Sequence, residues 1–172
     1  ALFLSEMLTA SAMQAYQGEI ERAVVLTLFI PLIMSSGGNS GSQATSLVIR
    51  ALALREIGLA DWWRIASREL PAGLTLGTIL GVLGVARIVL WQHLGLYDYG
   101  EHWGLVALTV GLALTAIVTF GSLTGSMLPF ALKRLGFDPA TASAPFVATL
   151  VDVSGLVIYF SVAYMVLRGT LL

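Results

Sequence analysis

The sequence predicts an all-α integral membrane protein with five transmembrane helices, and three observations lead to this class. Hydrophobic residues make up 57% of the chain and charged residues only 11%, whereas soluble domains carry about 25% charge. Several apolar runs approach or exceed the ~20 residues that a helix needs to cross a bilayer. No apolar/polar alternation suggests a barrel, and a helix satisfies its own backbone groups in lipid.

The first two predicted spans cover residues 1–17 and about 23–49. The first is short and contains Glu6, and because Ala1 opens directly into apolar sequence we expect the chain to be cut from a longer one. The second has a polar centre, in which Pro31 precedes the run SSGGNSGSQ. We expect a kink or a locally opened helix there. Irregular backbone at this depth is tolerated only inside protein or beside water, which favours a pathway wall, with a polar packing interface as the alternative.

Predicted spans three and four cover about 71–91 and about 105–132. The third carries four glycines at spacings of four, four and three, which let another helix approach closely: Gly73, Gly77, Gly81 and Gly84. We expect them to pack helices together rather than to line a pore. The fourth carries small and polar residues at helical spacing, whose hydroxyls either line a pathway or bond back to their own helix: Gly111, Thr115, Thr119, Ser122, Ser126 and Pro129.

The fifth predicted span, 143–167, holds the most informative residue of the chain. Asp152 lies inside this otherwise uncharged run, and a charge at that depth costs roughly 2.5–3.5 kcal/mol on insertion scales. An acid is retained at such a position where it lines a water-filled cavity, pairs with a cation or carries protons. We expect Pro145 to free backbone carbonyls one turn before the acid. Asp152 shares one small, polar helix face with Pro145, Ala148, Thr149, Gly155 and Tyr159.

The basic residues predict how the chain crosses the membrane. Two connections are rich in them, between spans two and three and between spans four and five: Arg50, Arg55, Arg64, Arg68, Lys133 and Arg134. The positive-inside rule places these connections in the cytoplasm, with the N-terminus inside and the C-terminus outside. The formal net charge of −1 argues against a nucleic-acid partner, because no basic patch would meet a polyanion.

Two long motifs resemble the MgtE family of magnesium channels. The segment PLIMSSGGNSGSQATSLVIRALALREI, with its GGNxGxQ core, is similar to the second membrane helix of the family. The segment GFDPATASAPFVATLVDVSGLVIYF is similar to the end of its fourth helix and to its fifth. The resemblance covers essentially the whole chain and implies a transmembrane channel domain over 1–172, in a bacterial inner membrane. The family's cytosolic N-terminal and CBS domains, which gate the pore, are missing.

The resemblance also implies a homodimer with an ion site in a pore between the protomers. It matches Asp152 to the acid that holds Mg²⁺ there and adds the backbone carbonyl of Ala148. Asp138, in the GFDPA turn, matches an acid that binds regulatory Mg²⁺ at the cytoplasmic mouth; a turn or N-cap aspartate ahead of Pro139 is the alternative. We expect the pore wall to include Gly37, Gly38, Asn39, Gln43, Pro145 and Thr149.

The predicted function is the passage of hydrated Mg²⁺ through the bilayer, down its electrochemical gradient. Mg²⁺ gives up its water slowly, and the attraction of Asp152 must stay weak enough for the ion to leave. The alternative is a proton- or sodium-coupled divalent-cation transporter with Asp152 as the coupling carboxylate. We do not expect an enzyme, because His93 and His102 lie in an outer loop away from Asp152. A purely structural subunit would leave the cost of Asp152 unexplained.

Overall fold

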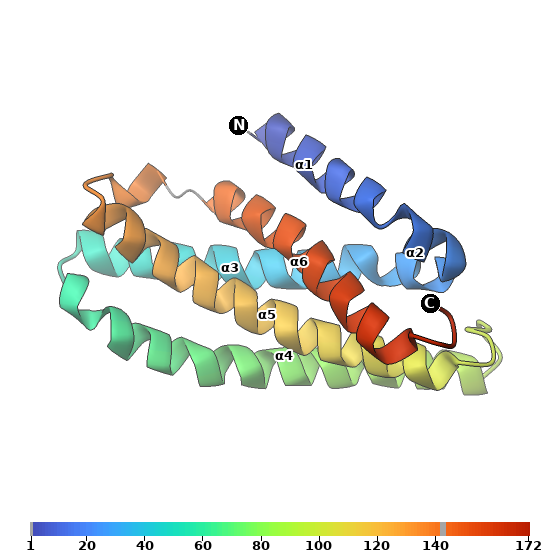
Figure 1. The fold of residues 1–172 in the computed structure, drawn as a ribbon. Helices are drawn as coiled ribbons and strands as arrows, with labels where there is room; N and C mark the ends of the chain where they lie inside the picture. Colours follow the sequence, from blue (N-terminus) through green and yellow to red (C-terminus); the bar gives the residue numbers. More distant parts are fainter. Residues whose placement is uncertain (1, 142–143) are drawn as a thin grey trace.

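The computed structural model describes residues 2–141 and 144–172, and over these residues it contains helices and no strands. Four long helices form a bundle (Figure 1): α3 (Ile30–Ala53), α4 (Trp62–His93), α5 (Trp103–Arg134) and α6 (Ala144–Leu167). Consecutive helices run in opposite directions. The α3–α4 and α5–α6 connections lie at one end, and the α4–α5 loop and the C-terminus lie at the other.

Four of the predicted spans are confirmed as helical segments long and apolar enough to cross a membrane. These segments are Val24–Ala53, Leu59–His93, Trp103–Arg134 and Pro145–Leu167. The third is longer than predicted, since the helix α4 starts nine residues before Pro71 and contains this proline. The short helix η2 (Leu59–Asp61) precedes α4, and the Gly58 N–H donates to the Asp61 carboxylate at 2.8 Å. Ser143, the predicted first residue of the fifth span, lies outside the described residues.

The N-terminal segment is shorter than these four. The helix α1 (Leu2–Ala15) has 14 residues, about 21 Å at 1.5 Å per residue, less than the ~30 Å hydrocarbon core. The short helix α2 (Gln17–Arg22) follows it. The helix α1 packs on α6, and just beyond its end the Tyr16 ring stacks on Phe160 with centroids 4.7 Å apart. The first span stays a prediction, as do the orientation and the dimer, and Ala1 lies outside the described residues.

The expected opening of the polar run in the second span is wrong. The helix α3 continues from Ile30 to Ala53, and Pro31 occupies its first turn, where the missing N–H breaks no bond inside the helix. The irregular backbone comes earlier, in the 3₁₀ helix η1 (Val24–Phe29), where the Ile30 N–H donates to the Thr27 carbonyl. Helical glycines and serines tolerate tight packing, so the run stays helical where neighbouring helices enclose it.

The glycines of α4 pack against α5, as expected. A Cβ added at Gly77 would lie 2.8 Å from the Thr115 carbonyl oxygen, and one added at Gly81 would lie 2.7 Å from the Gly111 carbonyl oxygen. The hydroxyls of Thr115 and Thr119 bond back to carbonyls of their own helix, at 3.0 and 2.7 Å. The polar residues of the fourth span therefore form a packing interface with α4. These contacts favour the packing alternative over one in which the residues line a pathway.

One side of α3 packs against α5 in the same way. A Cβ added at Gly125 would overlap the backbone of Gly41, so the two helices meet backbone to backbone. The Thr45 hydroxyl lies 2.8 Å from both the Gly41 and the Gly125 carbonyl oxygens. This contact leaves the other sides of α3 for α6 and for the outside of the bundle.

Candidate functional site

The carboxylate of Asp152 is the centre of the candidate site. Asp152 lies in the first half of α6, and its side chain is half-buried. Among the described residues it has no hydrogen-bond or ion-pair partner. The described part of the chain also contains no group of three His, Cys, Asp or Glu side chains that could hold a metal. An unpaired carboxylate in a membrane-length helix is free to attract a cation that arrives with its own water.

Gly38 of α3 lies directly beside this carboxylate. A Cβ added at Gly38 would lie 3.3 Å from Asp152 Oδ1, and 3.7 Å from both Cα and Cβ of Ala148. Three predicted site residues from two helices, Gly38, Ala148 and Asp152, are therefore brought together. Glycine leaves space at the carboxylate that any other residue would reduce. The role of the Ala148 carbonyl stays a prediction.

The other predicted residues of α3 separate into two groups. Gly37 is buried, and a Cβ there would meet Ile117 of α5 and Val151 of α6, so the packing does not bring Gly37 to Asp152. Asn39 and Gln43 are exposed, and the Asn39 amide donates to the Ser35 hydroxyl at 3.2 Å.

Two serines of the same exposed side are absent from the predicted list of wall residues, although Ser35 begins the polar run. Ser35 and Ser46 are exposed like Asn39 and Gln43, and Ser42, Gln43 and Ser46 line a shallow cavity of about 390 Å³. Their spacing of three and four from Asn39 and Gln43 would have found them. The outer side of α3 therefore exposes four polar side chains, with the exposed Leu32 and Leu47 among them.

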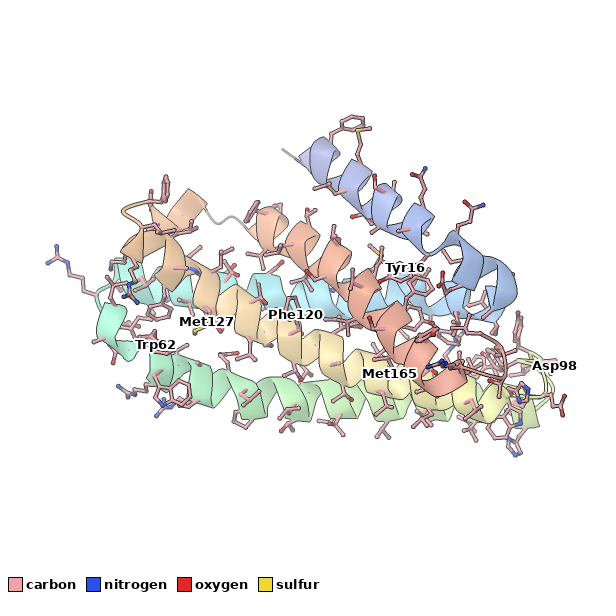
Figure 2. All side chains as sticks on the ribbon, in the orientation of Figure 1. Tyr16, Trp62, Asp98, Phe120, Met127 and Met165 are labelled. Carbon is pink, nitrogen blue, oxygen red and sulfur yellow. The ribbon has the colours of Figure 1, made fainter. Side chains whose placement is uncertain are left out.

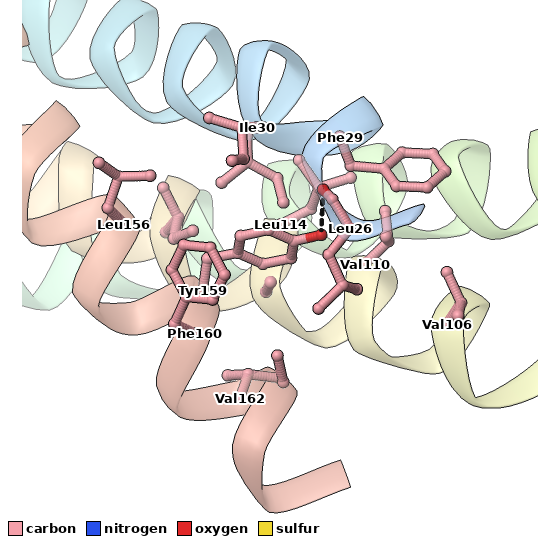
Figure 3. Close-up of a cluster of buried hydrophobic side chains, with 14 of the residues drawn as sticks. Leu26, Phe29, Ile30, Val106, Val110, Leu114, Leu156, Tyr159, Phe160 and Val162 are labelled. Carbon is pink, nitrogen blue, oxygen red and sulfur yellow. Dashed lines mark hydrogen bonds between the residues drawn. The ribbon is translucent and has the colours of Figure 1, made fainter. Parts of the chain in front are cut away.

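The residues of the polar face predicted for α6 differ in their exposure. Pro145 is exposed, and the Thr149 hydroxyl donates to its carbonyl at 3.0 Å. Gly155 and Tyr159 are buried instead, and the Tyr159 hydroxyl donates to the Leu26 carbonyl at 2.9 Å (Figure 3). The expectation that Pro145 frees carbonyls next to the acid is wrong, because its missing N–H would have served residue 141, before α6 begins.

Asp138 lies apart from Asp152, in the connection between α5 and α6. Its Oδ1 accepts the Ala140 N–H at 2.9 Å, which is the local bond of a turn aspartate. Asp138 and Lys133 line a small cavity of about 140 Å³ at this end of the bundle. The turn role is therefore present, and regulatory Mg²⁺ binding stays a prediction.

Arg87 and His93, the basic residues in the second half of α4, lie away from Asp152. The Arg87 guanidinium lies 5.1 Å from the centre of the Trp91 ring and 6.0 Å from that of Phe29. His93 Nδ1 lies 2.9 Å from the Val89 carbonyl oxygen, and its ring contacts Trp103 edge-on. These contacts explain how Arg87 and His93 are accommodated, and neither involves Asp152.

Comparison with known proteins gives a consistent set of relatives. The family model described as MgtE, divalent cation transporter, matches residues 30–162. The chain is 42% identical over 168 residues to the magnesium transporter MgtE of Thermus thermophilus, covering 98% of this chain and 35% of that protein. It is 35% identical to the magnesium transporter MgtE of Enterococcus faecalis, over 97% of this chain and 35% of that protein. The chain thus spans about a third of the length of the curated relatives it matches.

Proposed function

The chain belongs to the MgtE family of divalent cation transporters, and on this premise we propose that it transports Mg²⁺ across the membrane through a site at Asp152. The family matches over residues 30–162, which include α3, α4 and α5 completely and most of α6. The chain is a multi-pass membrane protein. Its family membership supports a transport role and not an enzymatic one.

The observation that carries the proposal is the unpaired Asp152 carboxylate beside Gly38. Burying a charge in a bilayer is costly unless the charge has a partner or faces water. The described residues provide no such partner, and Gly38 places no side chain against Oδ1, where a Cβ would lie only 3.3 Å away. A hydrated cation is the partner that suits both features, because it brings charge and fills volume.

We propose that the ion passes with most of its water. Stripping Mg²⁺ is slow, and its oxygen ligands lie at about 2.0–2.1 Å in a rigid octahedron. An assembled site with few carboxylates therefore acts on the water shell, and it holds the ion weakly enough for release. The membrane potential drives entry with about 2.3 kcal/mol per charge per 100 mV, and a divalent ion gains twice that.

We further propose a homodimer in which the polar side of α3 and the Asp152 region of α6 face their copies across a two-fold axis. The exposed Asn39 and Gln43 would be expensive against lipid. A two-fold axis brings identical residues together, so two Asp152 carboxylates would supply −2 opposite a 2+ ion. Cytosolic gating domains in a longer protein, with Asp138 binding regulatory Mg²⁺, belong to the same proposal.

The test is Mg²⁺ flux into liposomes under an imposed membrane potential. Replacing Asp152 with asparagine removes the charge and keeps the shape, so we expect flux to fall at least tenfold, or selectivity for divalent ions to be lost. That factor corresponds to about 1.4 kcal/mol of lost attraction. The matched control is Glu101→Gln, which removes the same charge from an exposed loop residue and should leave flux within twofold.

Two results would contradict the proposal in different ways. Potential-driven flux that is unchanged in Asp152→Asn would remove Asp152 from the ion site. Flux that acidifies or alkalinises the lumen, or that requires sodium, would instead favour the coupled transporter with Asp152 as the coupling carboxylate. A pH-sensitive dye in the same liposomes separates these cases.

A further inference from the structure

A second feature of the bundle lies away from Asp152, at the end that carries the basic connections. A groove of about 560 Å³ runs between the start of α4 and the end of α5, within the ~300–1,000 Å³ range of small-molecule sites. Its lining includes Leu59, Trp62, Met127 and Phe130. Figure 2 labels Trp62 and Met127 close together at this end. None of the lining residues belongs to α3 or α6.

One charged group completes this otherwise apolar groove. Arg134, the last residue of α5, is the only ionisable residue in its lining. Among the described residues Arg134 has no ion-pair partner, and no carboxylate lines the groove. Its neighbour Lys133 has the same charge but lines the separate cavity that contains Asp138. The groove therefore offers an apolar surface with one unpaired guanidinium in its lining.

We propose that this groove binds an anionic phospholipid of the bilayer, with an acyl chain along the apolar lining and the phosphate on Arg134. An amphiphile of this kind has an apolar chain and an anionic head next to each other, which is the arrangement of the lining. Arginine recognises phosphate oxygens with two parallel hydrogen bonds. The indole of Trp62, 49% exposed, has the amphipathic character that favours the level of the lipid headgroups.

The experiment uses Trp62 as the reporter. The chain has four tryptophans, so Trp63, Trp91 and Trp103 are replaced with phenylalanine and Trp62 is kept. The protein is reconstituted into vesicles that contain brominated phosphatidylglycerol or, in parallel, brominated phosphatidylcholine. We expect the anionic lipid to quench Trp62 at about one fifth of the mole fraction that the zwitterionic lipid needs. That preference is the factor given by about 1 kcal/mol for one basic residue near the surface.

The variants separate a specific site from general attraction. Arg134→Gln should reduce the preference to near one, whereas Lys133→Gln, with the same loss of charge one residue away, should keep it. Equal quenching by both lipids in the parent, or a preference that survives in Arg134→Gln, would overturn the proposal. Protection of Trp62 from both lipids would also overturn it, because a second copy or another protein segment would then cover the groove.

Discussion

Gly38 is the residue on which the geometry at Asp152 depends most directly. Its neighbour Gly37 is also buried and also lacks a side chain, yet the two glycines face different surroundings. Gly37 faces the side chains of Ile117 and Val151, whereas Gly38 faces a carboxylate oxygen. If Asp152 holds the ion as proposed, a methyl group at position 38 would occupy space next to the carboxylate that the ion and its water need.

The first prediction compares two glycine substitutions. Gly38→Ala places a Cβ 3.3 Å from the flexible end of Asp152, so the fold should tolerate it, with a change in unfolding free energy within about 1 kcal/mol. Mg²⁺ flux should nevertheless fall severalfold. Gly125→Ala places a Cβ on the Gly41 backbone, which cannot move aside, and should destabilise the fold by about 1–3 kcal/mol. Liposome flux and unfolding in detergent measure both effects. Normal flux in Gly38→Ala would show that the space beside the carboxylate is not needed.

The break between η1 and α3 is the clearest arrangement at the scale of elements. Pro31 has no N–H for the Thr27 carbonyl, and the Ile30 N–H donates to that carbonyl instead. The Leu26 carbonyl would have received the Ile30 N–H in a continuous α-helix, and it accepts the Tyr159 hydroxyl. The carbonyl that the shift to a 3₁₀ bond leaves without its α-helical donor is thus bonded by a tyrosine of another helix. This bond joins α6 to η1, directly before α3, and α3 and α6 are the two helices that meet at Asp152.

The second prediction tests this bond with two tyrosines of the same helix. Tyr159→Phe removes the hydroxyl from a fully buried ring and should cost about 1 kcal/mol of unfolding free energy, the usual net value of one hydrogen bond. Tyr164→Phe, at a side chain that is 47% exposed, should change stability by less than about 0.5 kcal/mol. Equal effects of the two substitutions would mean that the Leu26–Tyr159 bond contributes nothing specific.

At the scale of the whole molecule, the bundle leaves an uneven outer surface. The α4 helix exposes large apolar side chains such as Ile79, Val82 and Leu83, which suit lipid. The outer side of α3 exposes Ser35, Asn39, Gln43 and Ser46, which do not. The outer side of α4 is therefore suited to lipid, whereas the polar side chains of α3 suit water or a second protein chain.

The third prediction is that the polar side of α3 meets its copy. The chain contains no cysteine, so each variant carries a single thiol. Asn39→Cys in membranes should give dimers with a short bismaleimide reagent, because a two-fold axis beside Asp152 would bring the two thiols close together. Leu83→Cys, on the apolar side of α4, should remain monomeric on the gel. Dimers from Leu83→Cys alone would place the interface on α4 and contradict the proposed pore.

Much of this fold could be predicted from sequence, because a lipid bilayer permits few backbone conformations. A bilayer requires every backbone group to be satisfied, so apolar runs became helices, and four predicted spans are confirmed with modest changes at their ends. Asp152 could be predicted as a functional residue for a similar reason, because a charged side chain inside a membrane is costly. The side of α3 that faces Asp152, the place of Pro31 in a first turn and the packing of Thr115 against Gly77 could not be predicted.

Those features depend on neighbours that the local sequence does not specify. Glycine, serine and threonine suit a tight helix contact as well as a hydrated wall, because small size serves the first and polarity the second. The residue type therefore cannot distinguish Gly37, which packs on Ile117, from Gly38, which faces Asp152. The sequence alone determined the class, the long helices and the acid inside the last of them. Only the tertiary structure decided which small residues pack and which remain beside the carboxylate, since that depends on which helix lies opposite each of them.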